Sequence, residues 1–369
     1  MIAIAALSAR PLAVWAAADG APAIVLDAFG DLDTRRAAAE WHAVRAGDRM
    51  ALDGPRLLAT LAALARRGDV EGWVAGGGFD EQPGLLQAAA ETLPLFGTPP
   101  AGHRLTRDAP AFFALLDRLG TEHPPVSFEP PPAREDGWLL KHPHSAAGLH
   151  VSRWQGQAAA AGSYWQRECA GQPMSATFVA NGDDAALLGL NHLLTAEQPG
   201  RPFVFRGAVG PVAVPEPLRR EVEALVRRLA RECGVKGLAS LDFIEADGRA
   251  QVLELNARPS ATASLYPRID GVSPLQAHLR ACRQGWLPVA GAADRVLRGL
   301  EVVYARRALL LSAAAAQRLA DAGDLHDLPG PGSAFEPGDP LCTIEAPVDG
   351  PEALARRRDN LLDLVEGMT

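Results

Sequence analysis

One predicted hairpin constrains the fold of this chain more than any other stretch. It lies in SLDFIEADGRAQVLELNARPSA, residues 240–261. Residues 239–244 alternate between apolar and polar side chains like a strand, a polar turn follows, and residues 251–256 alternate again. Two such runs joined by a short turn predict a pair of antiparallel strands. The fold must therefore contain an antiparallel sheet that includes this hairpin.

Three oxygen-bearing side chains share one face of the predicted hairpin. Glu254 and Asn256 are two residues apart on a strand and point the same way, and pairing across the hairpin brings Asp242 beside them. Two carboxylates and an amide oxygen suit Mg²⁺ or Mn²⁺, because Mg²⁺ takes a few protein oxygens and completes its octahedron with water and phosphate. From spacing alone, a solvated sheet face with an ordinary acid pair is an equal alternative.

The whole chain sets outer limits on fold and function. Its 369 residues, of which 48% are hydrophobic, allow two or three domains with their own cores. The net charge of −8 disfavours a nucleic-acid-binding protein, which would carry a basic surface. The four cysteines are far apart and form no CxxC pair, so neither a zinc ribbon nor a disulfide framework is indicated.

The N-terminus is apolar but lacks the basic segment of an export signal, and charged residues interrupt it. No uninterrupted apolar stretch there is long enough to span a membrane. Together with the cysteine pattern, this leads us to expect a cytoplasmic protein without a membrane span.

The pattern along the chain predicts an α/β protein of three parts. Residues 1–102 alternate short apolar strands with helices, which is typical of a parallel α/β domain. Residues 103–289 hold an amphipathic helix and the hairpin. Residues 290–369 are predicted to form a small C-terminal β-rich domain with a final helix. Residues 76–78 are three glycines without dinucleotide-binding spacing, and we interpret them as a strand-to-helix turn.

Three polar residues of the N-terminal part lie where parallel sheets place ligands. Ser8, Arg10 and Asp31 follow predicted strands or occupy the loops after them. They fit ordinary turns equally well.

The hairpin resembles the signature of ATP-grasp enzymes, in which an acid on one strand is followed by Glu-x-Asn on the next and often by an arginine. The resemblance implies an α+β ATP-grasp fold with a two-subdomain nucleotide-binding core. It implies that Asp242, Glu254 and Asn256 hold one or two Mg²⁺ ions against the phosphates of ATP. Arg258 would face the γ-phosphate. Phosphoryl transfer needs this neutralisation of charge and an in-line arrangement.

A second segment, GWLLKHPHSAAGLHV, resembles the strand, lysine and small-residue loop that cover the phosphates in this family. Lys141 would then contact the α- and β-phosphates, and Ser145 to Gly148 would form the lid. The loop has one glycine, Gly148, where relatives usually have several. A surface strand that ends in a turn is the alternative interpretation.

Other residues are assigned by the same resemblance. YWQRECAGQPMSATF resembles the hinge that reads adenine through backbone groups, which implicates Gln166, Glu168 and Cys169. Upstream, Arg107 or Arg104 would supply a second cation for the phosphates. Lys236 matches a basic residue near the phosphates and would assist catalysis, although a solvated lysine after a helix is an equal alternative.

The resemblance extends to predicted ATP-dependent carboligases related to biotin carboxylase. In biotin carboxylase, the arginine that matches Arg258 is followed four residues later by a glutamate base, whereas this chain has Thr262. A threonine hydroxyl cannot accept a proton near neutral pH. Ser260 and Thr262 would instead hydrogen-bond a bound carboxylate.

We therefore expect a ligase that uses ATP to join a small-molecule carboxylate to an amine through an acyl phosphate. Carboxylation through carboxyphosphate, or nucleotide binding without turnover, are the alternatives. The sequence does not identify the acid or the amine. The resemblance suggests cofactor biosynthesis, and a homodimer is an open option.

Overall fold

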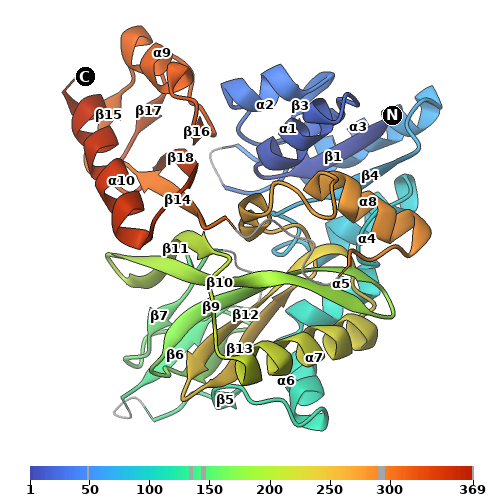
Figure 1. Ribbon diagram of the computed structural model, residues 1–369, viewed down its shortest axis with the longest axis vertical. Coiled ribbons are helices and arrows are strands. Elements are labelled where there is room, and N and C mark those ends of the chain that lie inside the picture. The colour runs from blue at the N-terminus through green and yellow to red at the C-terminus, as the bar shows by residue number, and fades with distance from the viewer. Residues whose placement is uncertain (48–49, 133–135, 143–146, 290–295, 368–369) are drawn as a thin grey trace.

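The computed structural model describes residues 1–47, 50–132, 136–142, 147–289 and 296–367 (Figure 1). An N-terminal α/β region, a large antiparallel sheet with helices, and a C-terminal region follow one another from blue to red along the chain (Figure 1). Within the described residues, no helix is both long enough and apolar enough to cross a membrane.

A parallel four-stranded sheet forms the N-terminal region, as the sequence predicts. Its elements are β1 (Ile2–Ala6), α1 (Arg10–Ala18), β2 (Ile24–Asp27), α2 (Leu32–Ala37), β3 (Glu40–Ala43), α3 (Gly54–Arg67), β4 (Gly72–Ala75) and α4 (Pro83–Thr92). The strand order β3-β2-β1-β4 places β1 between β2 and β4. The carboxyl ends of β1 and β4 are therefore the switch point, where open α/β sheets place ligands.

Local signals set the ends of the helices. Asp53 caps α3 by accepting a hydrogen bond from the Arg56 amide at 3.1 Å, which satisfies one of the unpaired amides of the first turn. Gly68 ends the same helix with φ of 77°, a conformation that side chains disfavour. The glycine run after β4 is a tight turn, as expected: a side chain on Gly76 would collide with Ala6 of β1.

An eight-stranded antiparallel sheet forms the centre of the molecule, in the order β13-β12-β9-β10-β11-β14-β18-β16. The central elements are α5 (Pro100–Arg107), α6 (Ala109–Arg118), β9 (Gln172–Asn181), β10 (Ala185–Gln198), β11 (Arg201–Gly210), α7 (Glu216–Cys233), β12 (Lys236–Ala246), β13 (Arg249–Asn256), η1 (Ala261–Leu265) and α8 (Pro274–Gln284). Helices α6 and α7 pack on one face and η1 and α8 on the other. Leu225 and Leu229 belong to the buried stripe of α7. Burial of each such side chain stabilises the fold by about 1.5–3 kcal/mol relative to its exposure to water.

A second, small sheet lies beside the large one. Its strands are β5 (Val126–Ser127), β6 (Trp138–Lys141), β7 (Ser152–Arg153) and β8 (Tyr164–Arg167), in the order β5-β8-β6-β7. The loop between β6 and β7 rests on β11, because the Phe205 amide donates to the Ala147 carbonyl at 2.9 Å.

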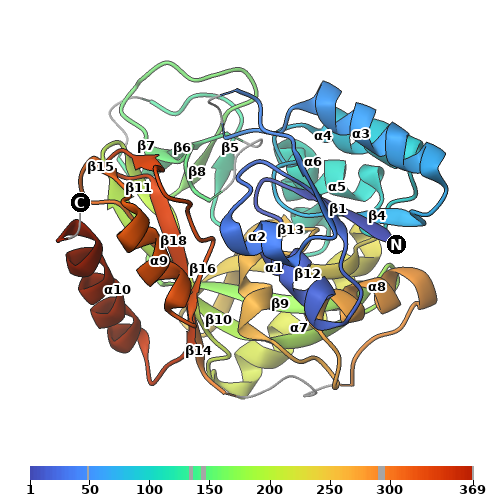
Figure 2. The ribbon, with the colours of Figure 1, turned by 90° about the horizontal axis from the view of Figure 1, so that it is seen from above.

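The C-terminal residues extend the central sheet. They form β14 (Arg298–Tyr304), β15 (Leu309–Leu310), α9 (Ala313–Asp321), β16 (Leu325–His326), β17 (Ala334–Phe335), β18 (Pro340–Pro347) and α10 (Pro351–Glu366). Because β14 pairs with β11 and β18 pairs with β14, this region shares one sheet with the hairpin. Figure 2 shows β16 and β18 close to α2, where the Leu32 amide donates to the Leu328 carbonyl at 2.9 Å.

Arg10, Asp327 and Glu345, here called the Arg10 cluster, tie the C-terminal region to the N-terminal one. Arg10 is 4% exposed and donates to Asp327 at 3.2 and 3.3 Å and also to Glu345. Ser8 donates to Asp327 at 3.1 Å. Of the three polar residues weighed as ligand contacts, Ser8 and Arg10 thus hold regions together. Burial and neighbouring acids raise the pKa of the third, Asp31, to about 8.

Candidate active site

Asp242 and Glu254 lie directly opposite each other on β12 and β13, as the hairpin pattern predicts. The Nδ2 of Asn256 donates to Asp242 Oδ2 at 3.1 Å and to Glu254 Oε1 at 3.3 Å. On the neighbouring strand β9, the Ser175 hydroxyl donates to Asp242 Oδ1 at 2.6 Å. The two carboxylates therefore converge on one atom of the amide between them.

This group of side chains fits a small divalent cation. Burial, and then repulsion by Glu254, raises the pKa of Asp242, so negative charge here is not fully compensated. The two carboxylates are hard oxygen ligands of the kind that Mg²⁺ takes, whereas the amide oxygen of Asn256 accepts from Arg107 at 2.6 Å and would face the same metal only after the amide turns. In the described parts of the chain, no three His, Cys, Asp or Glu side chains gather as a metal site. The donor set suits a metal that keeps water and phosphate among its ligands.

Arg107, at the end of α5, supplies positive charge to the same group. Its Nη2 donates to Asn256 Oδ1 at 2.6 Å, and its Nη1 donates to Glu254 Oε2 at 3.3 Å. The side chain of Glu254 is 46% exposed whereas that of Arg107 is 4% exposed. Arg107 therefore pairs with Glu254 from the protein interior and leaves the other side of the carboxylate open to solvent. Arg104, the alternative from the sequence, is exposed.

Asp80 connects the N-terminal region to these residues. It follows β4 and the glycine turn, and its side chain is fully buried. One carboxylate oxygen lies 2.7 Å from both Nε and Nη2 of Arg258, and the other lies 3.0 Å from Nη2 of Arg107. Burial alone would raise the pKa of Asp80, but the two arginines outweigh it and hold the pKa well below its usual value. Asp80, Arg107 and Arg258 are called the Asp80 cluster below.

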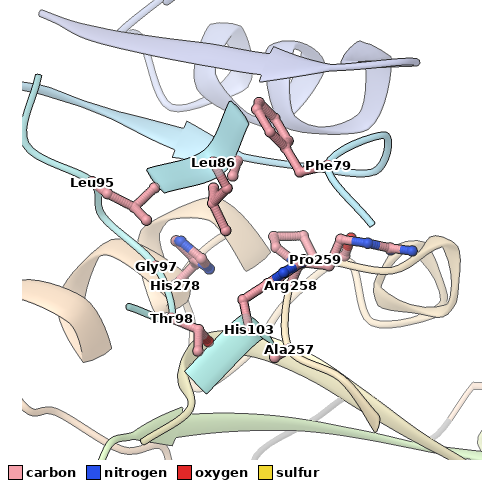
Figure 3. Close-up of a pocket in the computed structure, with 12 residues that line it drawn as sticks. Phe79, Leu86, Leu95, Gly97, Thr98, His103, Ala257, Arg258, Pro259 and His278 are labelled. Atoms are coloured by element: carbon pink, nitrogen blue, oxygen red, sulfur yellow. The ribbon is translucent and has the colours of Figure 1, made fainter. Parts of the chain in front are cut away.

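A small cavity lies between the two regions beside this cluster (Figure 3). Phe79 and Leu86 line it from the N-terminal side, and Ala257, Arg258 and Pro259 line it from the end of β13. Its volume is about 10 Å³. A space of that size matches one water molecule and is far smaller than a ligand pocket. The cavity therefore marks the seam between the regions and is not a substrate site.

Strands β12 and β13, which carry Asp242 and Glu254, are called the acidic hairpin below. Lys141 approaches this hairpin from the small sheet. It ends β6, and its Nζ donates to Oε1 of Gln166 on β8 at 2.5 Å. Burial lowers the pKa of Lys141 to about 8, and the charges that act against this change are those of Glu254 and Cys169. Lys141 therefore shares its electrostatic environment with Glu254.

Residues 108–262 match a protein family described as the ATP-grasp domain. The chain contains an ATP-grasp domain. The match includes the small sheet and the hairpin, and it confirms the resemblance drawn from the sequence. Among curated proteins, the large chain of carbamoyl phosphate synthase from Thermoplasma volcanium is 29% identical over 114 residues, which are 30% of this chain and 10% of that protein. The chain thus matches only a small part of that relative's length.

Solved structures share the fold over nearly the whole chain. An L-amino acid ligase from Bacillus licheniformis has a TM-score of 0.70 at 14% identity, with 98% of this chain and 96% of the other covered. N5-carboxyaminoimidazole ribonucleotide synthetase from Thermus thermophilus has a TM-score of 0.69 at 18% identity, with 99% and 98% covered. Biotin carboxylase from Campylobacter jejuni has a TM-score of 0.71 at 12% identity, with 99% and 95% covered. At such identities the likeness concerns the fold.

Lys236 is not brought to the acidic hairpin. It begins β12, six residues before Asp242, which corresponds to about 20 Å along a strand. It is paired there with Asn181, and its Cε lies 3.0 Å from the point where a side chain on Gly182 would begin. In this arrangement Lys236 lies beside the β9–β10 turn, away from Glu254.

The segment expected to form the lid is described in part. Gly148 has φ of 70° and lies so close to β11 that a side chain would collide with the Phe203 carbonyl. The need for glycine here is therefore explained by packing on β11. Ser145 lies outside the described residues.

The expected adenine hinge follows the small sheet. Gln166 is buried on β8, where its Oε1 binds Lys141. Glu168 forms an ion pair with Arg153 at 3.3 Å, and Cys169 comes next, half-buried. The segment thus runs directly from the lysine-binding strand into β9.

A buried network of hydroxyl groups lies beside the acids. Thr177 accepts from Asn191 at 3.0 Å and donates to Thr262 at 2.8 Å. Thr262 is 4% exposed and lies 3.0 Å from the Ser260 hydroxyl. Ser260 is partly exposed and does not use its side chain to cap η1. Ser260 is therefore the outer end of this network.

Two residues of the candidate site, Asp80 and Ser175, did not emerge from the sequence. Asp80 carries a recognisable signal, since it follows a strand and a glycine turn at the carboxyl edge of a parallel sheet, where ligands are commonly bound. Ser175 carries none, because an isolated serine in an apolar strand is indistinguishable from an ordinary buried hydroxyl.

Proposed function

We propose that this protein is an ATP-dependent ligase that joins a carboxylate to an amine through an acyl phosphate. The observation that carries the proposal is the convergence of Asp242, Glu254, Arg107 and Arg258 within the matched fold, with Lys141 on the opposing sheet. Phosphoryl transfer depends on this kind of charge neutralisation and positioning. Asp242, Glu254 and Asn256 would hold Mg²⁺ or Mn²⁺, which would neutralise charge on the phosphates.

The remaining roles follow from the charge of each side chain. Lys141 binds the α- and β-phosphates through its ammonium group, and Arg258 stabilises the charge that develops on the transferred phosphoryl group. Ser260 donates a hydrogen bond to the substrate carboxylate. The expected hinge at Gln166, Glu168 and Cys169 reads the adenine, and Gly148 ends the expected lid.

The reaction has two steps. An oxygen of the carboxylate attacks the γ-phosphorus, the bond from that phosphorus to the β–γ bridging oxygen breaks, and ADP leaves. The amine nitrogen then attacks the acyl carbon of the acyl phosphate, the bond from that carbon to the phosphate oxygen breaks, and phosphate leaves. The nitrogen loses its proton to water, which yields an amide.

Two observations favour an organic acid over bicarbonate and biotin. Thr262 occupies the position of the carboxylase base, and its hydroxyl is buried in contact with Thr177 and Ser260. The nearest acid to Arg258 is Asp80, whose pKa is held well below its usual value, so it is a weak base near neutral pH. The base that carboxylation of biotin requires is therefore missing from both positions.

The test is ADP release by the purified protein with bicarbonate alone and with a panel of carboxylates plus amines. We expect release that depends on both an acid and an amine. The Glu254→Gln variant, measured in parallel, identifies any contaminating ATPase. Bicarbonate-dependent release that no amine changes would overturn the ligase proposal and favour a carboxylase.

A further inference from the structure

The strongest feature that the proposed reaction does not use is the buried carboxylate of Asp80. One carboxylate oxygen contacts Arg258. The other contacts Arg107 and lies 3.3 Å from Nε2 of His103. Asp80 belongs to the N-terminal region, while Arg107 and Arg258 belong to the chain segments around the acidic hairpin. A single N-terminal side chain thus contacts both cations that border the candidate metal site.

The geometry at Arg258 is directional. Asp80 engages Nε and Nη2, which form one edge of the planar guanidinium. The remaining nitrogen, Nη1, lies 3.4 Å from the carbonyl of Pro259 and 4.0 Å from the point where a side chain on Gly77 would begin. Because Gly77 has no side chain, Nη1 faces the turn at the carboxyl end of β4. Holding one edge of the fork fixes where the other edge points.

The environment of Asp80 separates positioning from catalysis. Its side chain is fully buried while that of Arg258 is 15% exposed, so a substrate can reach the arginine but not the acid. The ionised state is maintained by its partners and needs no ligand. An isolated buried ion pair is weak evidence for a stabilising role, because apolar replacements are often equally stable. The partners of Asp80 are instead arginines that the proposed reaction requires.

We propose that Asp80 is a positioning residue that orients the guanidinium of Arg258 toward the acid substrate. This inference rests on the proposed ligase function for its kinetic consequence. It makes the N-terminal region a necessary part of the reaction centre, since Arg258 reaches its working orientation only when β4 and its turn are docked.

The first experiment is the Asp80→Asn variant, which keeps the size of the side chain and removes its charge. We expect kcat for ADP release to fall roughly 100-fold, as for a small displacement of a reacting group, while Mg²⁺–ADP affinity changes far less. Asp80→Glu should recover part of the loss. In an Arg258→Gln background, Asp80→Asn should cause little further loss, because both changes remove the same interaction.

Asp327→Asn is the matched control, since Asp327 also pairs with an arginine of the N-terminal region, and its described side-chain partners Ser8 and Arg10 lie outside the acidic hairpin. Its kcat should stay near that of the wild type even if its melting temperature falls. If Asp80→Asn behaves in the same way, Asp80 is a docking residue only and the proposal is wrong. Full additivity with Arg258→Gln would also overturn it.

A crystal structure of Asp80→Asn provides a readout that does not depend on activity. We expect the Arg258 guanidinium to turn away from Gly77, and an unmoved guanidinium contradicts the proposal. If Asp80→Asn does not fold, the same structural comparison is made with Asp80→Glu, which should displace Nη1 relative to Gly77. If the wild type releases no ADP with any acid and amine, the ligase proposal fails, and the position of Arg258 alone decides on Asp80.

Discussion

Two buried arginine–carboxylate clusters join the N-terminal region to the rest of the chain, and they differ in their neighbours. Arg107 of the Asp80 cluster continues to Glu254 and Asn256. The Arg10 cluster lies beside a second contact between the regions, in which the backbone amides of Asp327 and Leu328 both donate to the Asp33 carboxylate. We call this structural connection the clamp. Burial and charge pairing are thus common to both. Only the side chains one contact further on distinguish a candidate reaction centre from a clamp.

The largest expected effect distinguishes an acid of the candidate metal site, Glu254, from an acid of the Arg10 cluster, Glu345. Glu254→Gln should lower ADP release by roughly 10³-fold, because losing a ligand for Mg²⁺ removes several kcal/mol of charge stabilisation. Glu345→Gln removes an acid of the Arg10 cluster on the same sheet and should leave the rate near that of the wild type. Initial rates of ADP formation measure both variants, and Mn²⁺ binding followed by electron paramagnetic resonance measures the metal directly. Equal rates for the two variants would remove the distinction between the clusters.

The second effect concerns stability. Arg10→Met leaves Asp327 and Glu345 without their cation and should lower the free energy of unfolding by about 3–5 kcal/mol. Denaturation in urea measures this loss. The rate of ADP release per folded molecule should be unchanged.

Arg67→Met is the control for Arg10→Met, since Arg67 also has two carboxylate partners, Glu40 and Asp69, but is 38% exposed. Its loss should lower the free energy of unfolding far less than Arg10→Met does, because exposed ion pairs are screened by water. Similar losses of unfolding free energy for the two variants would show that the buried ion pairs of Arg10 stabilise the protein no more than exposed ones do.

A smaller effect is expected at the opposing sheet. Lys141→Ala should weaken Mg²⁺–ADP binding about tenfold or more through loss of a charged phosphate contact, measured by isothermal titration calorimetry. The chain has only one other lysine, Lys236. Lys236→Ala should bind ADP like the wild type because it lies beside Gly182. A loss at Lys236 equal to that at Lys141 would contradict the assignment.

The smallest effect is a dependence on pH. Lys141 has a lowered pKa of about 8, so its ammonium charge is present below that pH and is lost as the pH rises through it. ADP affinity should therefore decline above about pH 8, with bound phosphates moving the decline upward. Lys141→Arg should abolish it because the guanidinium stays charged. A wild-type affinity that is constant from pH 7 to about 10 would exclude Lys141 as a phosphate contact.

Local spacing predicted the part of the site that local structure determines. Asp242 and Glu254 are joined by one hairpin, so strand alternation and pairing place them together without knowledge of the rest of the fold. The parallel N-terminal sheet followed in the same way from alternating strands and helices. These features depend on contacts between segments adjacent in sequence.

The residues that the sequence could not place depend on distant contacts. Arg258 and Asp80 are 178 residues apart, and Arg107 and Glu254 are 147 apart. No periodicity links such pairs. The assignment of Lys236 rested on its match to a basic residue of the family, but the six residues of strand from Lys236 to Asp242 separate the two by about 20 Å. The joining of the C-terminal strands to the central sheet was equally invisible to local patterns.

The separation of Arg10 from its partners has a consequence for biosynthesis. Asp327 and Glu345 follow Arg10 by 317 and 335 residues, so the ribosome makes them long after the strand that precedes Arg10. N-terminal domains commonly fold while the chain is still being made. The guanidinium of Arg10 is therefore hydrated until Asp327 and Glu345 have been synthesised. Closing so long a loop also carries an entropic cost. Docking of the C-terminal region on the N-terminal one is therefore a late event, completed only when β18 has left the ribosome.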